Sequence, residues 1–181
     1  MRIQKACGLD QPPTNAVEDD MQVRAHRTRL EEELRAVRDE LLVSAHRIPS
    51  DRFDWAPQAG MKSFREQLRE VGTMEKIVVE FIKSGKETEW GEAVQWTGHD
   101  LDSTLSELKS IRAATLALLW STPEDKLQEP VHALWGKVPS GPHAEREGLF
   151  RWIARHEYYH IGQIVTYLWI LGDNPYRRSA S

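Results

Sequence analysis

Residues 149–172 read LFRWIARHEYYHIGQIVTYLWILG, and this stretch decides the fold. Its apolar residues and two of its histidines recur every three or four positions, which places them on one face of an α-helix. That face carries Leu149, Ile153, His156, His160, Ile164, Tyr167 and Leu171. Gly172, followed by Pro175, is typical of a helix C-terminus. The stretch therefore predicts a helix with one face in a protein core and two histidines on that face.

Three earlier segments show the same spacing of apolar residues, in residues 30–45, 64–81 and 101–119. Ser63 and Glu66 form a capping-box pattern at the start of the second segment. Four helices of roughly 20 residues each, every one with an apolar face, are the components of a four-helix bundle. The sequence therefore predicts an all-α protein of this architecture.

The connections and the N-terminus complete the domain plan. A long connection, residues 121–145, is expected between the third and fourth helices, with a helical turn near residues 122–126. Loops of this length are uncommon and often functional, and this one would also allow neighbouring helices to run parallel. Residues 1–21 have no period and contain two adjacent prolines and an acidic cluster, which predicts a flexible N-terminal segment. We therefore expect one bundle domain over residues 22–181.

The composition excludes several classes of protein. The 24 basic and 28 acidic residues give a net charge of −4, so no basic excess is available to bind nucleic acid. A single cysteine, Cys7, excludes internal disulfides and sites with several cysteine ligands. No run of about 18 apolar residues is present, and the N-terminus lacks the apolar core of a secretory signal. We therefore expect a cytoplasmic protein with no membrane or nucleic-acid partner.

The two histidines of the last helix are candidate metal ligands. His156 and His160 stand four residues apart, so both imidazoles can reach one ion from the same helix face. Two buried imidazoles need polar partners, and either a metal ion or a hydrogen bond between neutral histidines would satisfy them. Glu70, at the edge of the second helix's apolar face, offers a third ligand, although a salt bridge to an arginine would also account for it.

Other polar residues are candidates for roles beside such a site. Glu157 and Gln163 are the candidate catalytic residues. Glu157 is either a carboxylate or general base behind the histidines, or one half of a salt bridge between helices. Gln163, one turn beyond His160, either orients a ligand or bound water or lies at a helix contact. His132 and His143, in the long connection, could each supply a fourth ligand or an acid–base group.

The last helix also resembles that of a known family. Residues 155–175, RHEYYHIGQIVTYLWILGDNP, are similar to the final helix of the DinB/YfiT-like family of metal-dependent enzymes, which reads roughly H-x-x-x-H-x-x-Q-x-x-x-Y-L-x-x-x-G-x-x-P. The matching positions are His156, His160, Gln163, Tyr167, Leu168, Gly172 and Pro175. Trp55 and Pro57, ahead of Ser63, resemble the family's entry to its second helix, so the resemblance spans about residues 23–176.

The resemblance implies a DinB-like four-helix bundle that holds a divalent metal ion. The family usually has a histidine seven residues after the serine that starts the second helix, and here Glu70 stands at that position. The departure means either that the metal is lost or that the site has two histidines and one carboxylate. We favour the second, because glutamate is itself a metal ligand and the helical phase is kept. Zinc or nickel is the expected ion, with iron and manganese as further candidates.

The resemblance also implies a class of function. The family includes transferases and isomerases that use low-molecular-weight thiols, so we expect a metal-dependent hydrolase or a thiol-dependent transferase acting on a small-molecule substrate. Because Cys7 lies in the N-terminal segment, the thiol would come from outside the chain. Family members often pair, so a homodimer is expected. The alternative is a non-catalytic dimeric bundle or stress-response protein with a structural or degraded metal site.

Overall fold

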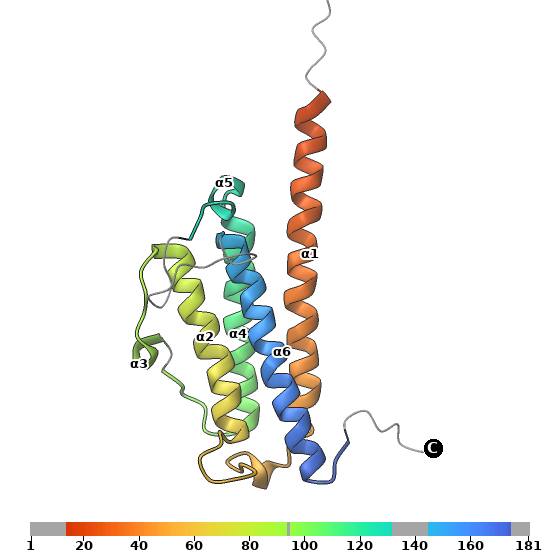
Figure 1. Ribbon diagram of the computed structural model, residues 1–181, viewed down its shortest axis with the longest axis vertical. Helices are drawn as coiled ribbons and strands as arrows, with labels where there is room; N and C mark the ends of the chain where they lie inside the picture. Colours follow the sequence, from red (N-terminus) through yellow and green to blue (C-terminus); the bar gives the residue numbers. More distant parts are fainter. Residues whose placement is uncertain (1–13, 94, 132–144, 175–181) are drawn as a thin grey trace, which may run out of the picture.

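The protein is a bundle of four long helices. The structure, a computed structural model, describes residues 14–93, 95–131 and 145–174. The long helices lie side by side (Figure 1), and they are α1 (Thr14–Ala45), α2 (Phe64–Ser84), α4 (Leu101–Ser121) and α6 (Arg146–Ile170). Three short elements complete the described residues: η1 (Ser50–Arg52), α3 (Trp90–Ala93) and α5 (Glu124–Leu127). The all-α four-helix bundle predicted from the sequence is confirmed.

The ends of the helices follow the local sequence. The Ser63 side chain accepts a hydrogen bond from the backbone N–H of Glu66, and the Glu66 carboxylate accepts one from the backbone N–H of Ser63. This is the predicted capping box at the start of α2. α2 ends at Gly85, whose φ of 69° is the left-handed conformation that glycine adopts readily at a helix end. These two ends fix which side chains α2 turns towards its neighbours.

The predicted N-terminal boundary is partly wrong. α1 begins at Thr14, so residues 14–21, which the sequence placed in the flexible N-terminal segment, are helical. In Figure 1 this end of α1 projects beyond the other three long helices. Residues 1–13 lie outside the described part of the chain.

The four long helices do not alternate in direction. Along the sequence, α1 and α6 run downwards in Figure 1, whereas α2 and α4 run upwards. The connection of residues 85–100, which carries α3, returns along the side of α2 and makes α2 and α4 parallel neighbours. The sequence suggested that the connection of residues 121–145 would allow neighbouring helices to run parallel. Instead, α4 ends and α6 begins at the same end of the bundle, so these two helices run in opposite directions (Figure 1). Its helical turn, α5, lies close to the predicted place.

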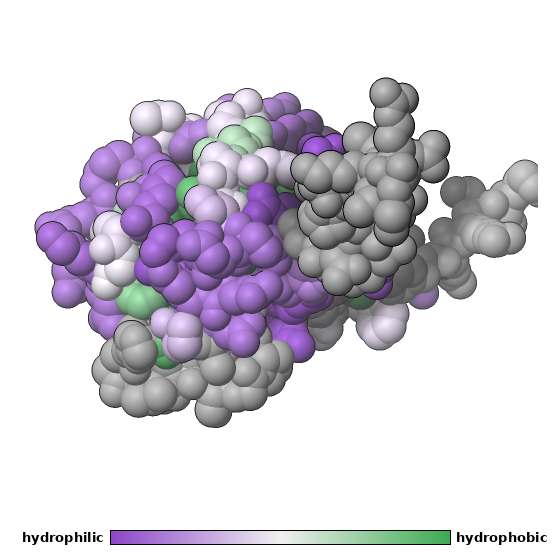
Figure 2. All heavy atoms as spheres, turned by 90° about the horizontal axis from the view of Figure 1, so that it is seen from above, coloured by the Kyte–Doolittle hydropathy of each residue, from purple (hydrophilic) through white to green (hydrophobic). Residues whose placement is uncertain are grey.

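The core is built from the inward faces of all four long helices. α1 packs mainly against α6, and α2 packs against both α4 and α6. Leu34, Leu68, Leu108 and Ile164 are fully buried examples, one from each helix. The described surface is mostly hydrophilic at the end of the bundle that Figure 2 shows. Within the described residues, no helix combines the length and the apolar character needed to cross a lipid bilayer.

Four charged side chains are buried inside this core, one from each long helix: Arg38, Glu75, Arg112 and Glu157. Arg38 donates to Glu75 and to Glu157, in both cases at 2.6 Å. Arg112 donates to Glu75 at 2.8 Å and to Glu157 at 2.5 Å. Each carboxylate thus meets both guanidinium groups, and the two positive charges balance the two negative charges. We call these four residues the core ion cluster.

The four charges of the cluster stabilise one another. Burial alone would raise the pKa of Glu75, but Arg38 and Arg112 outweigh this effect and hold the pKa below its ordinary value. Thr115 adds a hydrogen bond from its hydroxyl to Glu75 at 2.6 Å. Buried charges are tolerated only when they are paired and hydrogen-bonded, and here each is. The cluster therefore ties the four long helices together at one level of the bundle.

Gly72 allows α2 to approach α4 closely, and its replacement by alanine is expected to destabilise the protein. A Cβ atom at Gly72 would lie 2.8 Å from the Trp96 ring and 2.9 Å from Leu108. Gly72→Ala should therefore lower the free energy of unfolding by about 1–3 kcal/mol, measured by urea denaturation. Gly162→Ala is the matched control, because this α6 position has open space around it. The control should gain up to about 1 kcal/mol from helix propensity, and equal effects at both positions would contradict the close approach.

Candidate metal centre

α2 and α6 bring the three predicted metal ligands together. Glu70 lies seven residues after Ser63 in α2, and His156 and His160 lie one turn apart in α6. His160 is 2% exposed, whereas His156 and Glu70 are half-buried. Because α2 and α6 pack against each other, the three side chains meet at the contact between these helices.

The potential ligand atoms converge on one small volume. The Nε2 atoms of His156 and His160 lie 3.3 Å apart, and Nε2 of His160 lies 3.7 Å from Oε2 of Glu70. One ligand atom from each of the three residues lies within 4.8 Å of the other two. Ligands at about 2.1 Å in a tetrahedral site are about 3.4 Å from one another. The observed spacing therefore fits three ligands of a single ion.

Both imidazoles are neutral at physiological pH. Burial, helped by the neighbouring His160, lowers the pKa of His156 to about 4. Burial also lowers the pKa of His160. The Trp152 ring stacks on the His156 ring, with 5.0 Å between centroids and 12° between planes. A neutral imidazole carries the lone pair that a metal ion needs, so protons do not compete with metal binding near pH 7.

The lowered pKa of His156 predicts a pH dependence of stability in the metal-free protein. An unfolded histidine titrates near pH 6.5, so on acidification the unfolded chain binds this proton first. The contribution to stability is therefore complete above about pH 6.5 and is lost as the pH falls towards about 4. Urea denaturation in the presence of a chelator, at pH 7 and pH 4.5, should show a larger loss for the wild type than for His156→Gln. Equal losses in both proteins would contradict the buried neutral imidazole.

Lys62 supplies the positive charge that faces Glu70. Its Nζ forms an ion pair with Oε2 of Glu70, the oxygen atom that also faces His160. The backbone carbonyl of Lys62 accepts a hydrogen bond from the Tyr167 hydroxyl at 3.1 Å, which anchors this residue to α6. The Lys62 side chain is 55% exposed, so its ammonium group can move aside without disturbing the core. The salt bridge that the sequence allowed for Glu70 thus exists, with a lysine rather than an arginine.

A cavity of about 260 Å³ opens beside Glu70 and His160. Gln67 lines it and is 1% exposed, and its side chain interacts with the Tyr167 hydroxyl but makes no hydrogen bond of normal geometry to the described residues. Leaving a buried amide without partners costs free energy, which a molecule bound in the cavity would offset. Gln163 and Tyr159 also line the cavity, and the Gln163 amide donates to the Tyr159 hydroxyl at 2.9 Å.

The structure separates the two candidate catalytic residues. Gln163 lines the cavity, where it holds the Tyr159 hydroxyl. Glu157 is 0% exposed and belongs to the core ion cluster, so of its two alternatives the salt bridge between helices is the one observed. Its carboxylate does not line the cavity and is engaged by two arginines, which leaves it unsuited to act as a general base there. His132 and His143 lie outside the described residues.

Sequence reasoning missed Lys62 and Gln67. Gln67 carries a usable signal, because it precedes Glu70 by three residues and therefore shares its face of α2. Lys62 has no such signal in the sequence. It lies before α2, and the conformation of the turn that precedes the helix brings its side chain to Glu70. Helical periodicity places residues within a helix, but not residues in the segment that leads into it.

These features define the class of protein as an all-α bundle with a cluster of two histidines and a glutamate between two of its helices. The profile of the DinB superfamily matches residues 33–164, and the chain belongs to this superfamily. The family resemblance seen in the sequence is thereby confirmed. Among solved structures, the chain is similar to a DinB-like protein, YjoA, from Bacillus subtilis, with a TM-score of 0.64 and 19% identity over 81% of this chain and 93% of that chain. This likeness shows the fold. No functionally curated protein matches the chain.

Proposed function

We propose that the protein is a metal-dependent enzyme that holds one divalent ion through Glu70, His156 and His160. The observation that carries the proposal is the convergence of three ligand atoms, all within 4.8 Å of one another. The low pKa of His156 supports it, since a neutral imidazole is the metal-binding form. The buried amide of Gln67 in the adjacent cavity, which makes no hydrogen bond of normal geometry to the described residues, also supports it, because a bound substrate would supply such bonds.

The proposed reaction class follows from the donor set and the cavity. An ion with three ligands from the described residues keeps a position open, as catalytic zinc sites do. When bound, it would supply a Lewis acid that acidifies a water molecule or an external thiol. Zinc or nickel suits one carboxylate and two imidazoles best, and iron or manganese is also compatible. We therefore propose a hydrolase or a transferase that uses a low-molecular-weight thiol.

The cavity residues would hold the small-molecule substrate. Gln67 offers both a carbonyl acceptor and an amide donor at the buried end of the cavity. The hydroxyl of Tyr159, held by Gln163, offers a further donor. Lys62, once it leaves Glu70, would place a positive charge at the more exposed side of the site. This lining suits a small polar molecule with an anionic group.

Metal analysis tests the proposal. Protein purified without chelators should contain about one divalent ion per chain, and added metal should raise the melting temperature of the stripped protein. Glu70→His, which restores the family's usual three histidines, should keep the ion, whereas Glu70→Ala should bind it at least about tenfold more weakly. Absence of metal together with no thermal shift on adding zinc, nickel, manganese or iron would overturn the proposal. Unchanged affinity in Glu70→Ala would show that Glu70 is not the third ligand.

Replacing Lys62 by methionine is expected to tighten metal binding. The ammonium group holds the Glu70 oxygen that the ion would need, and it also repels a divalent cation. At about 5 Å this repulsion is of order 1–2 kcal/mol even at a water-like dielectric constant, which corresponds to roughly tenfold in affinity. Isothermal titration of zinc into the stripped proteins measures the change. Lys83→Met, an exposed α2 lysine paired with Glu80, is the control and should bind zinc like the wild type.

The alternative, a non-catalytic dimeric bundle with a structural site, makes a different prediction about ligand exchange. In a cobalt-substituted protein, an open site should bind an added small thiol and show a new charge-transfer absorption. A site closed by a fourth protein ligand would leave the spectrum unchanged. Light scattering after size-exclusion chromatography tests the proposed homodimer separately, because either function is compatible with a dimer.

A further inference from the structure

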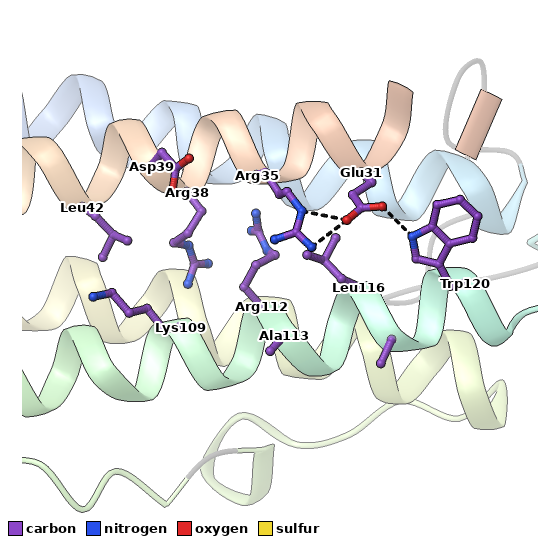
Figure 3. A pocket seen from close by; sticks show the side chains of 11 residues that line it. Glu31, Arg35, Arg38, Asp39, Leu42, Lys109, Arg112, Ala113, Leu116 and Trp120 are labelled. Carbon is purple, nitrogen blue, oxygen red and sulfur yellow. Dashed lines mark hydrogen bonds and ion pairs between the residues drawn. The ribbon is translucent and has the colours of Figure 1, made fainter. Parts of the chain in front are cut away.

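The cavity between α1 and α4, with a volume of about 480 Å³, has a lining of balanced charges (Figure 3). Glu31 accepts a hydrogen bond from Arg35 at 2.7 Å. Asp39 and Lys109 both line the end remote from Trp120. The remaining charged lining residues are the two arginines of the core ion cluster, which the two carboxylates of that cluster neutralise. This lining therefore selects no ligand by its charge.

The cavity beside the metal centre is balanced in a different way. The charged side chains that line it are those of Lys62 and Glu70, and they pair with each other. Burial lowers the pKa of His160, and of the two charges that also act on this pKa, Glu70 raises it and Lys62 lowers it. The balance therefore depends on a single ion pair, and one member of that pair is the carboxylate that we propose as a metal ligand.

The backbone of Lys62 is held in place, whereas its side chain can move. Its carbonyl accepts the hydrogen bond from the Tyr167 hydroxyl at 3.1 Å, and the next residue, Ser63, is the N-cap of α2. The side chain is 55% exposed, and the ammonium group of a lysine is a point charge on a flexible four-carbon chain. The ammonium group can therefore turn away from Glu70 while it stays beside the cavity.

A metal ion at the proposed site would end the pairing of Lys62 with Glu70. Oε2 of Glu70 pairs with Lys62 and also faces Nε2 of His160 at 3.7 Å. An ion held by these two ligands would compete with the ammonium group for one oxygen atom and would repel it. The charges of Lys62 and Glu70 cancel in the metal-free protein, whereas the same site with a divalent ion carries a net positive charge. An anion would then be the favoured partner of Lys62.

We propose that Lys62 binds the anionic group of the substrate, and that it becomes available to do so when Glu70 binds the metal ion. This inference rests on the proposed metal site and adds an order of binding to it. The buried amide of Gln67 lines the same cavity and offers a hydrogen-bond donor to the same anion. The substrate class is a small organic molecule with an oxyanion group such as a carboxylate. By linkage, the ion and the anion each tighten the binding of the other.

The first test needs no metal. Glu70→Gln keeps the size of the side chain but removes the charge that holds Lys62. Benzenesulfonate is the anionic probe, and methyl phenyl sulfone is its uncharged control. Binding is followed at constant ionic strength through the side-chain amide signal of Gln67 in the full-length, metal-free, ¹⁵N-labelled protein, assigned with Gln67→Leu. Metal-free Glu70→Gln should bind benzenesulfonate with a dissociation constant of about 1 mM, and the metal-free wild type should bind it at least about tenfold more weakly.

The double variant Glu70→Gln/Lys62→Met shows whether Lys62 is the group that binds. It should return the affinity for benzenesulfonate to the weak wild-type level, because the released ammonium group is gone. The sulfone should bind all three proteins alike. The proposal would be overturned if Glu70→Gln bound benzenesulfonate no more tightly than the wild type, or if the double variant bound it as tightly as Glu70→Gln.

The second test measures the coupling between ion and anion. In isothermal titrations, about 10 mM benzenesulfonate should tighten zinc binding by the wild type about fivefold. The gain should fall below about twofold in Lys62→Met and should persist in Lys83→Met, the matched control on the exposed side of α2. An equal gain in Lys62→Met would mean that the anion binds the ion itself, and would overturn the proposal. A protein that binds no zinc would contradict the metal site and the order of binding, while the metal-free test would still decide the role of Lys62.

Discussion

Glu157→Gln is expected to lower the free energy of unfolding by about 3–5 kcal/mol. The substitution keeps the size of the side chain but removes one of the two negative charges of the core ion cluster. Arg38 and Arg112 would then share the single carboxylate of Glu75 in a site where neither cation can reach bulk water. The expected loss is a large fraction of the stability of a domain of this size. Urea denaturation followed by circular dichroism measures it.

Glu80→Gln is the matched control for this effect. Glu80 forms an exposed ion pair with Lys83, and its loss should change the free energy of unfolding by less than about 1 kcal/mol. A cost for Glu157→Gln as small as that of the control would show that Glu157 is not needed to balance the buried arginines. The result would also reopen a role for Glu157 beside the histidines.

His160→Ala is expected to reduce zinc or nickel affinity at least about 100-fold. Loss of a group that merely supports a ligand already costs about 10–100-fold, and here a proposed ligand itself is removed. His160 is the most buried of the three proposed ligands, and its Nε2 faces both of the others. Isothermal titration of the stripped protein measures the affinity, and circular dichroism confirms that the variant is folded.

His99→Ala is the matched control for His160→Ala. His99 is exposed and precedes α4, so its imidazole should contribute nothing to metal affinity. A His160→Ala variant that binds metal as tightly as the wild type would remove His160 from the proposed ligand set. Equal losses in both variants would point to non-specific binding by surface histidines.

Much of the fold could be predicted because the local spacing of residues in the sequence determines where helices form. The repeat of apolar residues located all four long helices, and Ser63 and Glu66 marked the start of α2 at the observed residue. The direction in which each helix runs could not be predicted in this way. It depends on how the connection of residues 85–100 runs along the bundle, and loop length alone does not determine that path.

The core ion cluster shows a pattern that apolar periodicity overlooks. Each of its members stands four residues after a buried apolar residue of the same helix: Leu34, Val71, Leu108 and Ile153. On this spacing each charged residue belongs to the inward face. Scoring only apolar residues treats such positions as interruptions. One charge at such a position on each of four helices, two positive and two negative, is a signal that the charges pair inside the core.

The convergence of the three proposed metal ligands could be predicted, whereas their surroundings could not. The spacing of His156 and His160 and the phase of Glu70 are properties of single helices, and the structure brings the three residues together. The ion pair between Lys62 and Glu70 and the burial of Gln67 beside the cavity arise from contacts between α2, α6 and the turn before α2. Such contacts depend on tertiary packing, which single-helix periodicity does not describe.

Anomalous diffraction from a crystal of the zinc-loaded protein, recorded at the zinc edge, tests the central claim most directly. We expect one strong peak per chain, about 2.0–2.2 Å from an oxygen of Glu70 and from the Nε2 atoms of His156 and His160. A further ligand position, occupied by water or a small molecule, should face the cavity that Gln67 and Gln163 line. A peak that lacks His156 or His160 among its ligands, or no peak between α2 and α6, would contradict the account.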